Sequence, residues 1–89
     1  MPYIPLEDRA KFTDMFCNIP ELKSPGELNY LITEICQDYI LDKGLSYQTL
    51  NDVLGALEGC KLELYRRRVA PYEDGKIQAN GDVYEHIQL

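Results

Sequence analysis

Two serine-capped segments separated by a short break constrain the fold of this chain most. The first begins at residues 24–27, SPGE, where Ser24 is a typical N-cap, a proline takes the first helical position and Glu27 completes a capping box. Gly44 then marks the helix stop, and Ser46 opens the next segment. These signals predict two helices, one ending just before Gly44 and one beginning after Ser46.

Both segments carry apolar residues at intervals of three and four, the spacing of a helix with one buried face. In the first segment these residues are Leu28, Leu31, Ile32, Ile35, Tyr39 and Ile40. In the second segment they are Leu50, Val53, Leu54, Leu57, Cys60 and Leu64. The second segment runs about 24 residues to Pro71, so its helix would be about 36 Å long. Its far end is expected to project or to meet another subunit.

A third helix and a tail complete the predicted fold. Residues 5–18 are predicted to form a short first helix, with a proline where the chain enters it and another just beyond it. Pro71 is expected to end the long helix, so residues 71–89 are predicted to be an ordered, irregular tail with a turn at Asn80-Gly81. Its expected apolar anchors are Ile77, Val83, Tyr84, Ile87 and Leu89. The prediction is a single all-α domain, with three helices in residues 1–70.

The short length of the chain bears on its assembly. A hydrophobic fraction of 45% and a charged fraction of 27% are ordinary for a globular protein, which disfavours wholesale disorder. However, a chain of 89 residues buries only about 60–65% of the surface that its unfolded form exposes. Its stability is therefore marginal or shared with a partner subunit. We expect a homo-oligomer.

Composition excludes several classes of function. The net charge of -6 makes nucleic acid an unlikely partner, because that binding draws on clustered basic residues. No apolar run approaches the length of a membrane span, and no signal sequence is apparent, so a cytoplasmic location is expected. Three widely spaced cysteines, Cys17, Cys36 and Cys60, fall among apolar helical positions and are predicted to be reduced core thiols.

Signals for catalysis, cofactors and metals are weak. His86 is the only histidine, so no nucleophile with a histidine base is apparent. Glycine-rich phosphate loops are absent, and the sequence between Asp74 and Glu85 lacks the glycine and oxygen ligands of a calcium loop. Glu73 and Asp74 could serve acid and base chemistry in a cleft, but a solvated turn explains them better. We expect neither an enzyme nor a bound cofactor or metal.

The candidate binding residues cluster around one basic island in an acidic chain. Residues 61–70 contain four basic and one acidic side chain, and three of the basic residues are consecutive arginines directly before VAPYED. At helical spacing Lys61, Tyr65, Arg68 and Tyr72 share one face. Cations interleaved with aromatic rings suit an anionic ligand that carries a stackable base.

Three interpretations of the arginines stay open. Cations near a helix C-terminus are favoured by the helix dipole, and Glu63 lies three residues before Arg66. Arg66 and Arg67 could also pair with carboxylates of the tail, such as Asp82, in the same or another subunit. The other interpretations are a small-molecule site and a contact with a macromolecule.

Several motifs resemble a family of short bacterial and phage proteins of unknown function. They are MPYI, GELNYLIT, LELYRR, VAPYED, Lys76 and NGDVY, and they cover nearly the whole chain. The family pattern places its two arginines at Arg66 and Arg67, and its APYED motif at residues 70–74, whereas Arg68 departs from it. The resemblance implies a phage or prophage setting and shifts the candidate site toward Arg66, Arg67 and the PYED and NGD segments.

The functional prediction is a non-enzymatic protein that sequesters an anionic, nucleotide-like small molecule between subunits. This step is an analogy with small oligomeric proteins of that kind, which recur in phages. The candidate ligand-binding residues are Arg66, Arg67, Tyr65, Tyr72, Glu73, Asp74, Asn80 and Lys61. The alternative is an adaptor or inhibitor that contacts a host protein through the long helix and tail. A ligand site requires arginines that converge on a pocket, and an adaptor requires an exposed apolar stripe.

Overall fold

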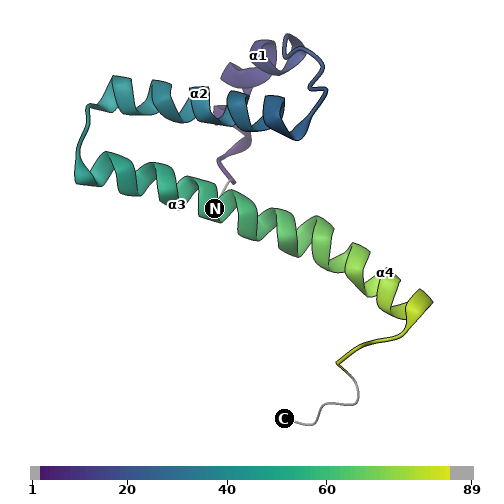
Figure 1. The fold of residues 1–89 in the computed structure, drawn as a ribbon. Helices are drawn as coiled ribbons and strands as arrows, with labels where there is room; N and C mark the ends of the chain where they lie inside the picture. The colour runs from purple at the N-terminus through teal and green to yellow at the C-terminus, as the bar shows by residue number, and fades with distance from the viewer. Residues whose placement is uncertain (1–2, 85–89) are drawn as a thin grey trace.

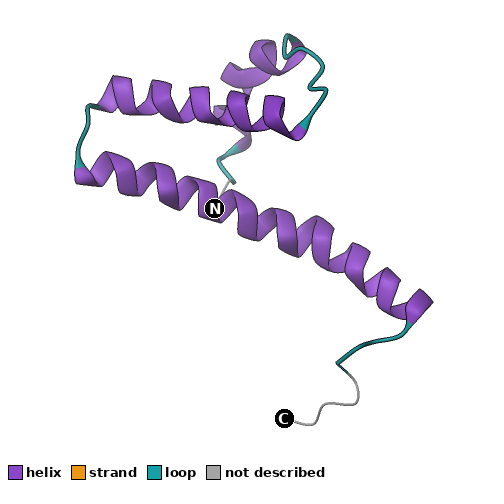
Figure 2. Ribbon diagram, in the orientation of Figure 1, coloured by secondary structure: helices purple, strands orange, loops and turns teal. Residues whose placement is uncertain are grey.

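A computed structural model describes residues 3–84 and contains only helices and loops over that range (Figures 1 and 2). Two 3₁₀ turns, η1 and η2, precede three α-helices, a π-helical segment (η3) and a last α-helix. Their bounds are η1 Leu6–Asp8, η2 Ala10–Phe12, α1 Thr13–Cys17, α2 Pro25–Lys43, α3 Tyr47–Leu64, η3 Tyr65–Val69 and α4 Ala70–Asn80. Because α3, η3 and α4 follow one another without a break, they form one helical rod of 34 residues.

Both predicted serine caps are confirmed. The Ser24 hydroxyl accepts a hydrogen bond from the Glu27 N–H at 3.1 Å, and the Ser46 hydroxyl accepts one from the Thr49 N–H at 3.1 Å. Each bond satisfies a backbone donor that the first helical turn leaves without a partner. Thr49 also exchanges a hydroxyl contact of 3.0 Å with Ser46. The capped ends fix where α2 and α3 begin.

A glycine turn folds α2 back against α3. Gly44 has φ 90° and ψ 147°, and its N–H donates to the Ile40 carbonyl at 2.8 Å. The two helices then run antiparallel, side by side (Figure 1). The Tyr39 hydroxyl donates to Asp52 Oδ2 across the pair at 3.0 Å, and this bond is the main cause that raises the pKa of Tyr39.

Gly44→Ala is expected to lower the free energy of unfolding by about 2 kcal/mol, because a side chain strains a backbone with this positive φ. Gly55→Ala is the matched control. Gly55 lies inside α3, and a Cβ built there meets nothing within 4 Å. That change should raise stability by about 1 kcal/mol through helix propensity. Urea unfolding checks both, and equal effects of the two substitutions would contradict the role assigned to the turn.

The predicted first helix is present but mostly not α-helical. Only Thr13–Cys17 is α-helix, and the preceding residues form the two 3₁₀ turns. No side chain caps either 3₁₀ turn or α1 at its N-terminus, and helices this short are marginal without such support. At the C-terminal end of α1, the side-chain amide of Asn18 donates a hydrogen bond to the backbone carbonyl of Asp14 at 2.6 Å and closes the turn.

The prediction that Pro71 ends the long helix was wrong. The irregular tail expected from residue 71 is helical as far as Asn80. Pro71 has no N–H, and its ring would crowd the carbonyl four residues earlier in a regular α-helix. The π-helical segment relieves this crowding by widening one turn, so that the Ala70 N–H donates to the Tyr65 carbonyl, one residue further back than in an α-helix. The helix ends instead at Gly81, with φ 88°.

Residues 3–84 leave nearly all of their apolar side chains at least partly exposed. Among the described residues, no hydrophobic residue is buried, and Thr49 is the one buried polar residue. The accessible surface is 8210 Å², and the radius of gyration is 17.9 Å. A compact protein of 10.3 kDa would expose about 5400 Å² and have a radius of gyration of about 12 Å. The apolar faces predicted for both helices exist, but one chain does not cover them.

This open packing also corrects the prediction for the cysteines. All three are free thiols, yet Cys36 is only half-buried, and Cys17 and Cys60 are exposed. Cys36 and Cys60 lie between α2 and α3, where a second layer of structure would be needed to bury them. They are apolar surface residues of the single chain and not members of a core.

Candidate interaction sites on the long helix

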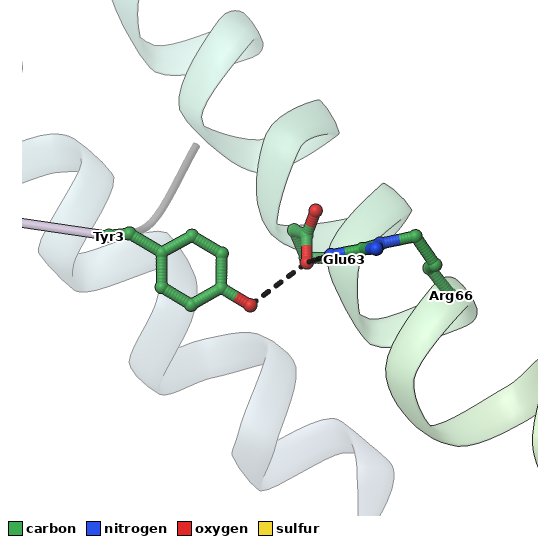
Figure 3. Close-up of polar contacts among 3 residues, drawn as sticks. All are labelled: Tyr3, Glu63 and Arg66. Carbon is green, nitrogen blue, oxygen red and sulfur yellow. Dashed lines mark hydrogen bonds and ion pairs between the residues drawn. The ribbon is translucent and has the colours of Figure 1, made fainter.

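Arg66 is held by a carboxylate of the same helix. Its guanidinium lies 3.1 Å from Glu63 Oε2, which also accepts a hydrogen bond of 2.9 Å from the Tyr3 hydroxyl. Figure 3 shows the two side chains approaching Glu63 from either side. The Glu63 side chain is only 15% exposed, whereas that of Arg66 is 65% exposed. This contact fastens the N-terminal segment to the end of α3.

The contact also changes the acidity of Glu63. The hydrogen bond from Arg66, followed by that from Tyr3, lowers the pKa of the Glu63 carboxyl below its ordinary value of 4.5. In turn, the hydrogen bond with Glu63 raises the pKa of Arg66. Arg66 therefore serves first as a structural counter-ion, which is one of the interpretations open from sequence.

Because the folded pKa of Glu63 lies below its unfolded value, the stabilisation from this carboxylate is present above that unfolded value. It is lost as the pH falls through the folded pKa. Arg66→Gln is expected to move the Glu63 pKa back toward 4.5 and to weaken this pH dependence. NMR titration of the carboxyl carbon checks the shift, with Arg68→Gln as the control because Arg68 does not contact Glu63. An unchanged pKa in R66Q would contradict the assignment.

The other two arginines are exposed. Within residues 3–84, neither Arg67 nor Arg68 makes a side-chain hydrogen bond or ion pair. Lys61 makes a long contact of 3.9 Å with Glu58. The π-helical segment adds one residue to the turn, which rotates later side chains by about 100° relative to α3. Tyr72 is therefore turned away from the face predicted to join it with Lys61 and Tyr65.

A hollow of about 520 Å³ lies where α4 ends. We call it the α4 hollow. Four of the eight predicted site residues line it: Tyr65, Glu73, Asp74 and Asn80. Its other lining residues are Ala70, Lys76, Ile77, Gly81, Asp82, Val83 and Tyr84. Lys61, Arg66, Arg67 and Tyr72 do not line it. The structure therefore divides the predicted site into a basic part and a separate acidic hollow.

The α4 hollow is acidic and is bordered by a local turn. Among the described residues that line it, the three carboxylates of Glu73, Asp74 and Asp82 outnumber the one cation, Lys76. Asp82 Oδ1 accepts a hydrogen bond of 2.8 Å from the backbone N–H of Tyr84, and this bond folds the chain after Gly81 beside α4. Lys76 Nζ lies 5.4 Å from the centre of the Tyr72 ring. The hollow is suited to cations and apolar groups.

A second concave surface was not predicted as an open site. It is an apolar groove of about 350 Å³ between α2 and α3, here called the α2–α3 groove. Its lining residues are Ile32, Ile35, Cys36, Tyr39, Asp52, Val53, Ala56, Leu57 and Cys60. The apolar periodicity did identify these residues, but a periodic stripe does not tell whether the same chain covers it.

Two further findings concern chemistry and membranes. Within the described part of the chain, no three His, Cys, Asp or Glu side chains are grouped so that they could hold a metal ion. His86 and the predicted anchors Ile87 and Leu89 lie outside the described residues. Within residues 3–84, no helix has the length and apolar character to cross a bilayer.

The chain matches a known protein family. Residues 1–83 match the family model described as "Domain of unknown function (DUF6899)". The match covers nearly the full chain, including Pro71 and the PYED segment that lines part of the α4 hollow. No curated protein and no solved structure matches the chain.

Proposed function

We propose that this chain, which belongs to the DUF6899 family, is a non-catalytic adaptor that binds a basic segment of another protein in the α4 hollow. One observation carries the proposal: the hollow gathers Tyr65, Glu73, Asp74 and Asn80 into an acidic concave surface that no arginine lines. This arrangement favours the adaptor over a phosphate ligand, which would be repelled by the carboxylates.

The position of α4 supports a contact with a macromolecule. The rod continues beyond the start of α2, so α4 extends past the hairpin and is accessible from several sides (Figure 1). The last carbonyls of a helix carry partial negative charge, which adds to the attraction of the side-chain carboxylates for a cation. Ile77 lines the hollow as an apolar contact between these polar groups. A short segment that combines Lys or Arg with one apolar side chain fits this surface.

A displayed library of random peptides tests the proposal. The wild-type protein should enrich peptides with Lys or Arg next to an apolar residue, and affinity should fall as salt rises. Glu73→Gln with Asp74→Asn should weaken binding of the enriched peptides at least tenfold. Glu7→Gln with Asp8→Asn is the control, because these carboxylates lie on η1, far from α4 in sequence. Enrichment that is indifferent to Glu73 and Asp74 would refute the adaptor site.

A second candidate rests on the two arginines whose side chains make no hydrogen bond or ion pair within residues 3–84. Arg67 and Arg68 are adjacent and exposed, and guanidinium groups bind phosphates through paired hydrogen bonds. Sequestration of an anionic nucleotide by a homo-oligomer, in the phage setting that the resemblance implies, would use them. Native mass spectrometry with cyclic nucleotides and ADP-ribose derivatives tests this candidate. A bound nucleotide that is lost in Arg67→Ala, Arg68→Ala would support sequestration over the adaptor.

A further inference from the structure

The α2–α3 groove is a long apolar surface that the chain leaves open. Ile35 on α2 and Leu57 on α3 both line this groove, yet Ile35 is 50% exposed and Leu57 is 40% exposed. We propose that a second copy of this chain covers the groove, with the two copies antiparallel and the α3 helix of each lying in the groove of the other. This interface is distinct from the α4 hollow and does not depend on the adaptor function.

The exposed area argues for a permanent partner. The chain exposes 8210 Å², about 2800 Å² more than a compact protein of its mass. A stable interface of standard size covers about 800 Å² on each partner. The excess surface is therefore ample for a dimer, and the groove supplies its apolar centre. Two such hairpins together would bury the faces of α2 and α3 in the manner of a four-helix bundle.

Charge distinguishes a second copy from an arbitrary apolar partner, and it also sets the direction. Residues 61–68 carry four basic and one acidic side chain, whereas residues 34–52, around the turn, carry four acidic and one basic. The middle of the groove on α3 lies between Val53 and Cys60. If the two-fold axis of the dimer passes through α3 at that level, residues 61–68 of one copy lie beside residues 45–52 of the other. The basic stretch then lies next to the acidic C-terminal end of the partner's α2.

A parallel pair has the opposite consequence, because it would set the two basic stretches side by side. Like charges in contact oppose association, and opposite charges favour it and fix the register. In the antiparallel pair, Arg67 and Arg68 lie level with the partner's turn, near the acidic C-terminal end of its α2, which carries Asp38 and Asp42. The same arrangement would leave these arginines less free to bind a nucleotide.

Cysteine cross-linking separates the two directions. One variant keeps only Cys60 (Cys17→Ser, Cys36→Ala), and the other carries Val53→Cys with all three native cysteines replaced. In the antiparallel pair, positions 53 and 60 face each other, while two copies of either position are offset by about 10 Å along the helices. A disulfide requires Cα atoms within about 7 Å. A mixture of the two variants should therefore form a cross-linked heterodimer, and neither variant alone should do so efficiently.

The cross-linking pattern supports the proposal or overturns it. Efficient self-linking of each variant, with little heterodimer, would show a parallel pair, and a monomeric mass for the full native chain by sedimentation would show no pair. Both results overturn the inference. Because the variants alter few apolar side chains, helix content by circular dichroism should match that of the native chain. Sedimentation of the native protein keeps the test valid if a variant fails to fold.

Discussion

About a thousandfold dilution is expected to lower the free energy of unfolding by about 4 kcal/mol per dimer, because association and folding are then one equilibrium. The physical reason is that the single chain has no buried hydrophobic residue among those described, so most of its apolar surface is covered only after assembly. Circular dichroism at low concentration, in parallel with fluorescence-detected sedimentation, should show loss of helix and loss of dimer together.

Leu57→Asp provides a sharper version of the same experiment, since it introduces a charge into the α2–α3 groove. The substitution should raise the protein concentration at which half of the dimer dissociates by at least a hundredfold. Leu41→Asp is the matched control, because Leu41 lies on α2 outside the groove and is already 79% exposed. A melting temperature independent of concentration would mean that the chain is stable as a single copy, and equal effects of the two substitutions would mean that the groove is not the interface.

The sequence predicted the elements of this fold better than its packing. Local signals decide where a helix starts, and both caps, at Ser24 and Ser46, act as the sequence indicates. The stop at Gly44 was likewise predictable, since few residues other than glycine adopt its backbone conformation. These features depend on only a few neighbouring residues, so no knowledge of the assembly is needed.

The apolar stripes show the limit of such reasoning. Spacing identifies Ile35 and Leu57 as members of apolar faces, but the spacing is the same whether a face is covered by its own chain or by another. The Glu63 contact illustrates a different limit. Its partner Arg66 lies three residues away and was a predicted candidate, whereas Tyr3 is 60 residues distant and could be placed only from the structure.

The candidate site was predicted in part for a similar reason. Tyr65, Glu73, Asp74 and Asn80 were selected as neighbours in sequence and do line one hollow. Their separation from the arginines could not be predicted, because it depends on the helix continuing through Pro71. Proline is a strong helix breaker in an α-helix, and the sequence gives no signal that one wider turn will accommodate it and let the helix continue.

Pro71→Ala is accordingly expected to stabilise the rod and to damage the α4 hollow. The substitution restores a backbone N–H and removes the ring that favours the π-helical segment, so the free energy of unfolding should rise by up to about 3 kcal/mol. A return to α register would rotate α4 by about 100° relative to α3. Glu73 and Asp74 would then move away from Tyr65, and binding of a basic peptide should be lost.

The opposite signs of these two effects make the experiment informative. Urea unfolding measures stability, and NMR couplings across hydrogen bonds report whether the Ala70 N–H still donates to the Tyr65 carbonyl. Pro25→Ala is the control, because Pro25 occupies the first position of α2, where no backbone N–H is required. If P71A kept the Tyr65 bond, the π-helical segment would be set by the packing of its own side chains and not by the proline. Tighter peptide binding in P71A would contradict the role given to the hollow.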